Sequence, residues 1–265
     1  MGFIGAGRVG KGLSLALSRA GYPISGLASR SRGDAQRVAD ASDVVFLTVP
    51  DDAIAAACAG IRWKNQSVVH CSGAAELFVL EKAPRAGGFH PLVMFADPEV
   101  AARNIAGSAI ALEASEPLLS QLKQMVKALG ARVLVIPPGA RAAYHAGAHY
   151  AAPFACGLLA EGVEIWRRIG IAPEDALPAL VSLLRGASEA VAHSDPARAM
   201  AGSVARGDLE TIKRHVAALE ALDAELARSY CAMALKTVPL AVGVSEARRE
   251  ELRVFLAGLT AAQRA

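Results

Sequence analysis

Residues 2–10, Gly-Phe-Ile-Gly-Ala-Gly-Arg-Val-Gly, decide the fold of this chain. Three glycines stand in the spacing Gly-x-Gly-x-x-Gly after a short apolar run, and apolar residues then recur at helical spacing. In a dinucleotide-binding fold the first glycine permits a tight turn, the second admits a pyrophosphate, and the third lets the helix pack on the strand. The context favours this interpretation over a glycine-rich turn of another kind. Expected cofactor contacts are Gly5, Ala6, Gly7, Arg8 and Val9.

Short apolar runs alternate with helix-like segments as far as residue 136. Residues 44–49, Val-Val-Phe-Leu-Thr-Val, are apolar almost without interruption, which is typical of a parallel strand covered on both faces. Such alternation predicts right-handed crossovers and a doubly wound α/β sheet, the Rossmann arrangement. The expected strands are 1–4, 24–28, 44–49, 67–70, 86–89, 109–112 and 132–136.

After Pro137-Pro138 the pattern becomes helical throughout. We therefore expect a dinucleotide-binding domain over residues 1–136 and an all-α domain over residues 137–265. Pro153 lies inside the first expected helix and should kink or divide it. The expected helices are 140–169, 174–192, 208–236 with a break near Ala221, and 245–263.

The amino-acid composition of the chain argues against several classes of protein. The chain is 53% hydrophobic and 20% charged with a net charge of +3, and its lysines and arginines are scattered, so no nucleic-acid surface is expected. Four cysteines, none in a Cys-x-x-Cys pair, indicate a reducing compartment, and we expect a cytoplasmic protein. Lys11 argues against a signal peptide, and histidines and Pro153 in the charge-free stretch 142–160 favour a buried helix over a membrane span.

The choice of cofactor is made at the end of the second strand, about 20 residues past the glycine loop. The sequence there is Ser29-Arg30-Ser31-Arg32, whose hydroxyl and guanidinium donors suit the 2′-phosphate of NADP(H). A carboxylate would instead accept a hydrogen bond from the ribose of NAD. The alternative is a solvated polar turn, with Asp34 as the nearby acid that would favour NAD.

Three later strands end in polar turns that should gather at the cofactor edge of the sheet. Residues 48–54 read Thr-Val-Pro-Asp-Asp-Ala-Ile, and we expect Val49, Pro50 and Asp51 to contact the cofactor. The turn at 70–74 adds Ser72, expected to contact cofactor or substrate, and the turn at 89–92 adds His90. Ordinary strand ends, helix caps and turns explain the same residue types, and both roles are compatible.

These motifs together resemble a family of uncharacterised bacterial Rossmann-like proteins with a helical C-terminal domain of unknown function. That family is similar in build to deazaflavin-dependent NADP oxidoreductases, pyrroline-5-carboxylate reductases and 6-phosphogluconate dehydrogenases. The resemblance implies an NADP-binding oxidoreductase, dimeric through the helical domain, but no substrate. Where the family tends to carry Ser-Asn, this chain has Ala152-Pro153. The matching stretches are 5–10, 46–54, 69–74, 90–92, 141–146 and 205–208 with the later His215.

His145 is the first expected catalytic residue, because relatives by build place a proton-donating Lys or His at this point of the first helix. It would act as general acid or base, with His90 as a second catalytic candidate. Arg141 shares a helix face with Tyr144 and His145, and both Arg141 and Tyr144 are expected to contact the substrate, Arg141 by binding its carboxylate. A structural role for His145 at a domain interface is the alternative. His145 and His149 have metal-chelating spacing, but no glutamate lies between them, so no metal is expected.

The sequence thus predicts hydride transfer between NADP(H) and a small carbonyl, imine or hydroxy compound. Two similar enzyme classes are weighed: pyrroline-5-carboxylate reductases, disfavoured by the sequence at 89–95, and prephenate dehydrogenases, which the His-Pro turn resembles. A non-catalytic NADP-sensing or partner-binding protein is the alternative from another class, kept open by Ala152-Pro153.

Overall fold

The structure is a computed structural model and describes residues 1–29 and 32–261. The chain packs as two compact units, Met1–Ala152 and Pro153–Ala265. The division falls later than the expected boundary at Pro137-Pro138, because helix α6 (Arg141–Ala151) packs with the first unit. The residues expected to be catalytic therefore all lie in one unit.

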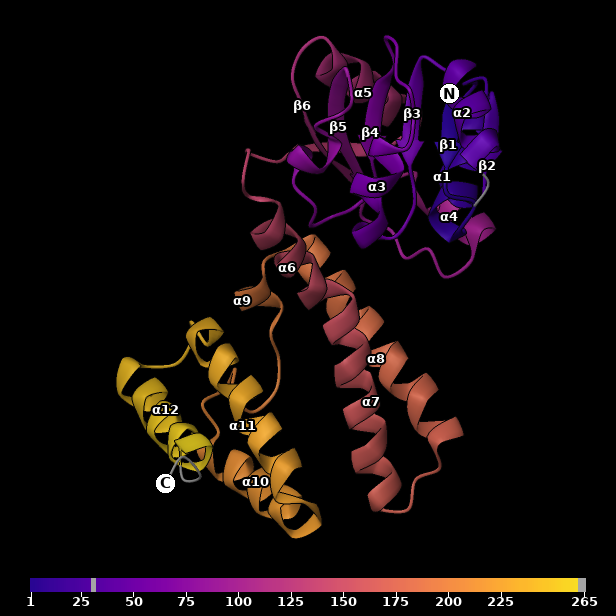
Figure 1. Ribbon diagram of the computed structural model, residues 1–265. Helices are drawn as coiled ribbons and strands as arrows, with labels where there is room; N and C mark the ends of the chain where they lie inside the picture. Colours follow the sequence, from indigo (N-terminus) through magenta and orange to yellow (C-terminus); the bar gives the residue numbers. More distant parts are fainter. Residues whose placement is uncertain (30–31, 262–265) are drawn as a thin grey trace. The chain divides into compact units, whose positions relative to one another are not determined.

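The first unit is built on a seven-stranded sheet with the order β2-β1-β3-β4-β5-β6-β7 (Figure 1). Every expected apolar run forms a strand, and the doubly wound Rossmann fold is confirmed. One difference concerns β6, which pairs antiparallel with β5. The connection after β5 contains α4 (Pro98–Asn104), which packs on α1 (Arg8–Arg19). The chain then returns to the sheet at the end where β5 stops, so β6 runs in the opposite direction. The strands are β1 Gly2–Ile4, β2 Gly26–Ala28, β3 Val44–Leu47, β4 Ser67–His70, β5 Arg85–Pro91, β6 Ala109–Ala114 and β7 Arg132–Val135.

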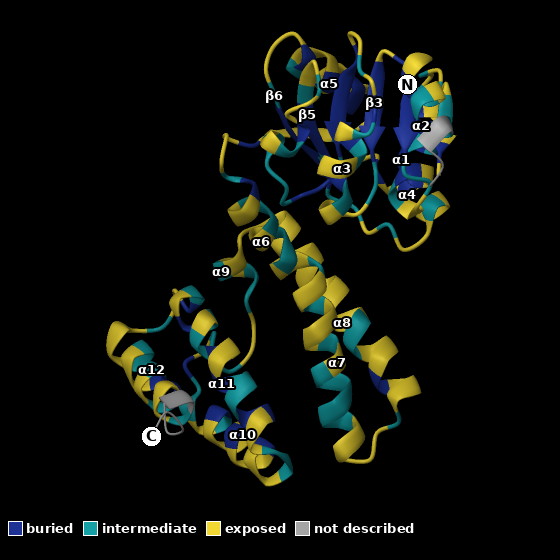
Figure 2. Cartoon of the chain, viewed as in Figure 1, coloured by how far each residue is buried: buried dark blue, intermediate teal, exposed yellow. Residues whose placement is uncertain are grey.

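Two hydrophobic clusters lie on the two faces of this sheet. One joins residues of the strands to α1, α4 and α5 (Leu118–Ala128). The other joins the opposite strand face to α2 (Arg32–Asp40), α3 (Ile54–Ala59) and the 3₁₀ helix η2 (Leu77–Leu80). Figure 2 shows the strands β3 and β5 buried between the helices, as expected for parallel strands covered on both faces.

The second unit consists of helices and their connecting loops, with no strand among its described residues. Pro153 divides the first expected helix, and Asp223 ends the helix that was expected to break near Ala221. Helices α10 to α12 share an apolar core, whereas α8 leaves Leu177, Leu183 and Leu184 exposed. Homodimer formation through this unit stays a prediction. The helices are α7 Pro153–Arg168, α8 Pro173–His193, α9 Pro196–Ala199, α10 Leu209–Leu222, α11 Ala224–Thr237, η3 Val238–Leu240 and α12 Glu246–Ala261.

None of the helices in the described residues combines the length and the apolar character needed to cross a membrane.

Candidate functional site

The glycine loop between β1 and α1 gives its three glycines three different environments. Gly5 has φ +120°, and a Cβ on it would lie 2.6 Å from the backbone carbonyl of Thr48. A Cβ on Gly10 would lie 2.0 Å from the Gly5 carbonyl oxygen, so close helix packing needs glycine there. A Cβ on Gly7 would meet no described atom within 4 Å. The loop is therefore tight at its ends and open in the middle, where a pyrophosphate would approach.

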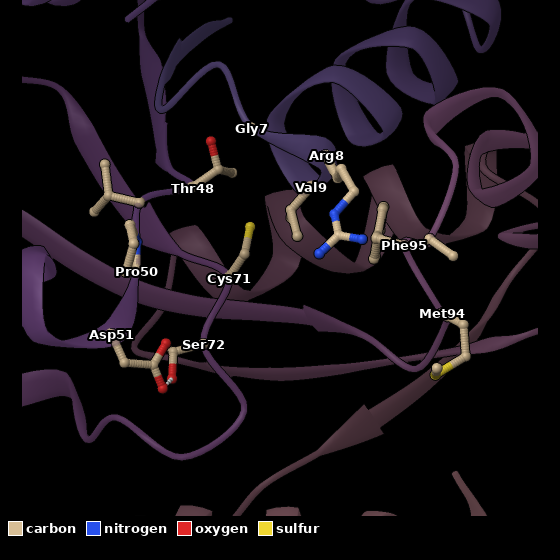
Figure 3. A pocket seen from close by; sticks show the side chains of 12 residues that line it. Gly7, Arg8, Val9, Thr48, Pro50, Asp51, Cys71, Ser72, Met94 and Phe95 are labelled. Atoms are coloured by element: carbon tan, nitrogen blue, oxygen red, sulfur yellow. Dashed lines mark hydrogen bonds between the residues drawn. The ribbon is translucent and has the colours of Figure 1, made fainter. Parts of the chain in front are cut away.

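Two cavities meet at this loop and share Gly7, Thr48, Val49 and Pro50. The first has a volume of about 550 Å³ and extends toward Cys71, Ser72 and Phe95 (Figure 3). The second, of about 660 Å³, extends toward Ser29 and the alanine-rich helix α3. Their lining includes the described residues expected to contact the cofactor: Gly5, Ala6, Gly7, Arg8, Val9, Ser29, Val49, Pro50, Asp51 and Ser72. The other two, Arg30 and Ser31, lie outside the described residues.

Other lining residues were not expected from the sequence. In the second cavity they are the small residues Ala53, Ala56, Ala57 and Gly60, whose size leaves space beside α3 for a flat group. The alanine run at 55–57 was the available signal. Met94, Phe95 and Ala96 bound the first cavity from the connection after β5, and no local pattern pointed to them. The combined surface has one long apolar wall beside the N-terminus of α1.

The hydroxyl of Ser72 is fully engaged within the protein. It donates to Asp51 Oδ2 at 2.7 Å and accepts from the amides of Ala74 and Ala75 at 3.2 and 2.9 Å. Figure 3 shows the Asp51 and Ser72 side chains facing each other at one end of the cavity. These bonds make 72–75 a structured turn, so the Ala74 and Ala75 amides point at Ser72 rather than at a substrate.

Two histidines and a tyrosine meet next to this turn. His90 lies on β5 itself rather than in the turn after it, and its Nδ1 is 2.8 Å from the Tyr144 hydroxyl. The ring of His145 stands perpendicular to that of His90, with 5.6 Å between centroids. Gly73 leaves room for it, since a Cβ there would lie 2.4 Å from His145 Cδ2. The structure therefore brings the two expected catalytic residues together beside Ser72.

Burial keeps these histidines neutral. Burial first, and then the neighbouring His145 and Arg141, lower the pKa of His90 to about 4 against an opposing effect of Asp51. The pKa of His145 is also lowered, first by burial and then by His149, whose Nδ1 donates to the His145 carbonyl oxygen at 2.9 Å. Burial raises the pKa of Tyr144 to about 12. At neutral pH the cluster thus holds uncharged donors and acceptors.

Arg141 is placed differently from the expectation. Its side chain is fully buried, its Nη1 lies 3.1 Å from Glu113 Oε2, and its Nη2 donates to the Ser72 carbonyl oxygen at 2.5 Å. A guanidinium with these partners and no exposed surface does not bind a substrate carboxylate. The expectation that Arg141 binds the substrate is therefore corrected, because the burial of its side chain leaves no surface for a substrate to contact.

The burial of His70, at the end of β4, makes the stability of the folded chain depend on pH. His70 is 0% exposed, neither ring nitrogen has a hydrogen-bond partner among the described residues, and burial lowers its pKa from 6.5 to about 3. Between these values the unfolded chain binds a proton that the folded chain does not, so stability falls as pH falls below 6.5. We expect this one group to remove about 3 kcal/mol between pH 7 and pH 4.5.

His70→Leu should abolish that component. Urea unfolding at pH 7, 5.5 and 4.5 would measure it, with His193→Leu on the exposed end of α8 as the control. The variant is expected to be at least as stable as the natural chain at pH 7 and to lose less stability on acidification. An identical pH dependence in both proteins would contradict the assignment.

Comparisons with known proteins agree with this architecture. Residues 108–237 match a family model described as a domain of unknown function (DUF2520), and no curated protein matches the chain. A Thermotoga maritima protein of known structure is 21% identical, with a TM-score of 0.70 over 100% of this chain and 99% of that one. A Bacteroides fragilis protein named as a candidate NADP oxidoreductase is 22% identical, with a TM-score of 0.69 over 90% and 97%.

A third similar structure is Plasmodium falciparum pyrroline carboxylate reductase with NADP bound, 15% identical with a TM-score of 0.54 over 91% and 97% of the two chains. At these identities the likeness establishes the fold. The chain therefore has a Rossmann-like fold, and its residues 108–237 are similar to the DUF2520 family model.

Proposed function

We propose that this chain is an NADP(H)-dependent oxidoreductase acting on a small carbonyl, imine or hydroxy compound. The observation that carries the proposal is the pair of cavities joined at Gly7, with the His90, Tyr144 and His145 cluster beside the turn that ends one of them. A dinucleotide needs such an extended surface, and a reductase needs a proton donor at its nicotinamide end.

The residues present fit the cofactor. The N-terminus of α1 carries no acidic residue in its first turn, and Gly7 leaves its amides open to a pyrophosphate. The cavity toward α3 suits an adenosine, and the cavity toward Cys71 and Ser72 suits a nicotinamide riboside. When bound, the nicotinamide supplies or accepts the hydride.

The chain's own contribution to the chemistry is a proton at His145. Because its pKa is lowered, the imidazole is neutral at pH 7; its N–H proton would pass to the substrate oxygen or nitrogen while its other ring nitrogen takes up a replacement proton from water, so the ring ends neutral. The His90–Tyr144 hydrogen bond holds the neighbouring ring, so His145 meets a fixed partner. Cys71 is a bystander, since burial raises the pKa of its thiol to about 12.

NADPH oxidation tests the proposal. The absorbance of reduced nicotinamide would be followed with a keto acid and with a cyclic imine, and the reverse reaction with a hydroxy acid and NADP. Turnover of any of these supports an oxidoreductase. Tight NADPH binding with no oxidation across the panel would favour the sensing alternative, for which the Ala152-Pro153 departure is the motivating feature.

The NADP preference has its own prediction, centred on Ser29. Ser29 is exposed at the end of β2 and lines the α3 cavity, while Asp34, the nearby acid, is paired with Arg37. We expect NADPH to bind more tightly than NADH. Ser29→Asp should weaken NADPH binding about tenfold or more, because its carboxylate repels the 2′-phosphate, and should spare NADH.

Fluorescence titration with both cofactors measures this change. Ser120→Asp, on the exposed surface of α5 outside both cavities, is the matched control for the added charge. Tighter binding of NADH than NADPH by the natural chain would overturn the assignment.

A further inference from the structure

Three residues paired across the strands β4, β5 and β6 mark the place where the buried guanidinium of Arg141 lies. His70 on β4 pairs with Gly88 on β5, and Gly88 pairs with Glu113 on β6. The guanidinium of Arg141 sits on Gly88: a Cβ there would lie 2.4 Å from Nη1 and 2.9 Å from Cζ. The absence of a side chain at position 88 is therefore what leaves room for the guanidinium of Arg141 against β5.

Arg141 binds two parts of the molecule through one planar group. Nη1 pairs with Glu113 on β6, and Nη2 donates to the carbonyl oxygen of Ser72, the residue that receives the Ala74 and Ala75 amides. The backbone amide of Arg141 also donates to Glu76 Oε1 at 3.2 Å. Both contacts on the β4 side lie in the segment 72–76, which bounds the site.

Arg141 is also the first residue of α6. Tyr144 and His145 lie one turn further along the same helix, where they meet His90 and Gly73. The buried guanidinium therefore joins the strand β6, the turn after β4 and the helix that carries the proposed proton donor.

We infer that Arg141 is a positioning residue: seated on Gly88 and paired with Glu113, it fixes α6 against the Ser72 turn and so sets the place of His145 and Tyr144. The inference rests on the proposed function for its effect on turnover, but not for its structural readout. Stability alone is a poor explanation, because a buried ion pair adds little net stability over apolar packing. The bond to the Ser72 carbonyl ties the guanidinium to the site itself.

The strand β5 offers a matched pair of variants. Gly88→Ala places a methyl group against the guanidinium and leaves every charged residue in place. Gly87→Ala is the control, since the same change on the same strand meets Leu118 and Leu122 on the opposite face. Arg141→Lys keeps the charge but cannot hold Glu113 and the Ser72 carbonyl in one planar fork.

We expect Gly88→Ala and Arg141→Lys to lower turnover about 10- to 100-fold, with KM and the NADPH dissociation constant changed about twofold or less, because catalysis suffers from small displacements of a reacting group. Gly87→Ala should retain turnover. If Gly88→Ala and Arg141→Lys fail to fold, Glu113→Gln weakens the same pair more mildly and takes their place. Natural turnover in folded Gly88→Ala or Arg141→Lys, or in Glu113→Gln where it is needed, would overturn the inference.

Histidine NMR separates this inference from the proposed function. The ring protons of His90 and His145 should shift in Gly88→Ala and stay in place in Gly87→Ala, whether or not the chain oxidises NADPH. Absence of turnover in the natural chain would count against the proposed function alone. Unchanged His90 and His145 signals in Gly88→Ala would count against the positioning role alone.

Discussion

Replacing His145 by alanine is expected to lower turnover about 10²- to 10⁴-fold while leaving the NADPH dissociation constant within about threefold of the natural value. The substitution removes the imidazole beside Gly73 and His90. It removes none of the residues that line the two cavities at the glycine loop. A large change in turnover with a small change in cofactor affinity is the signature of a group that acts on the reacting atoms.

Two further variants make the test of His145 specific. His145→Gln keeps an N–H donor and should retain more turnover than His145→Ala, because the working form of His145 is the neutral imidazole. His193→Ala, at the exposed end of α8, controls for the loss of a histidine. Steady-state kinetics and fluorescence titration measure both quantities. Natural turnover in His145→Ala would transfer the proton step to the His90–Tyr144 pair.

The pH profile adds an independent check on His145. Its pKa is lowered from 6.5 by burial, so the neutral form persists below that pH in the folded chain. Turnover in the natural chain should fall only as pH drops through this lowered pKa, on the acidic side of 6.5. Turnover that instead falls as pH rises through the lowered pKa would show that His145 carries a proton in its working state.

Local patterns in the sequence were enough to predict the sheet and the glycine loop. A nearly unbroken apolar run such as 44–49 reflects the burial of one strand, and the spacing of Gly5, Gly7 and Gly10 reflects one turn, so each can be recognised within a few residues. The second-unit helices were equally local, with Pro153 and Asp223 at their ends. The antiparallel direction of β6 could not be predicted from a local pattern, because it depends on where the preceding connection packs.

The position of Arg141 illustrates what local patterns cannot supply. An arginine on a helix is ordinarily exposed, and its burial here needs the absence of a side chain at Gly88 and a carboxylate at Glu113. These partners lie far from Arg141 in sequence. The same contacts draw α6 into the first unit, which is why Pro137-Pro138 does not mark the division. The two adjacent glycines of β5 were the available signal, since glycine inside a strand often marks a close approach.

Gly7→Val is expected to raise the NADPH dissociation constant about 100-fold or more while the chain stays folded. Gly7 caps α1 with φ −76° and ψ −170°, a conformation open to any residue, and a Cβ there meets no described atom within 4 Å. The valine side chain would instead fill the place where a pyrophosphate must approach the α1 amides. The loss of affinity would then come from the cofactor site and not from the fold.

This contrast makes Gly7 a sharper test than its neighbours in the loop. Gly10→Ala would drive a methyl group to 2.0 Å from the Gly5 carbonyl oxygen, so a loss of binding there follows from damage to the loop. Gly186→Val, on α8 and likewise without neighbours within 4 Å, controls for valine in place of glycine. Thermal unfolding should show Gly7→Val within a few degrees of the natural chain. Undiminished NADPH binding in that folded variant would remove the dinucleotide from this loop, and with it the basis for assigning His145 to hydride chemistry.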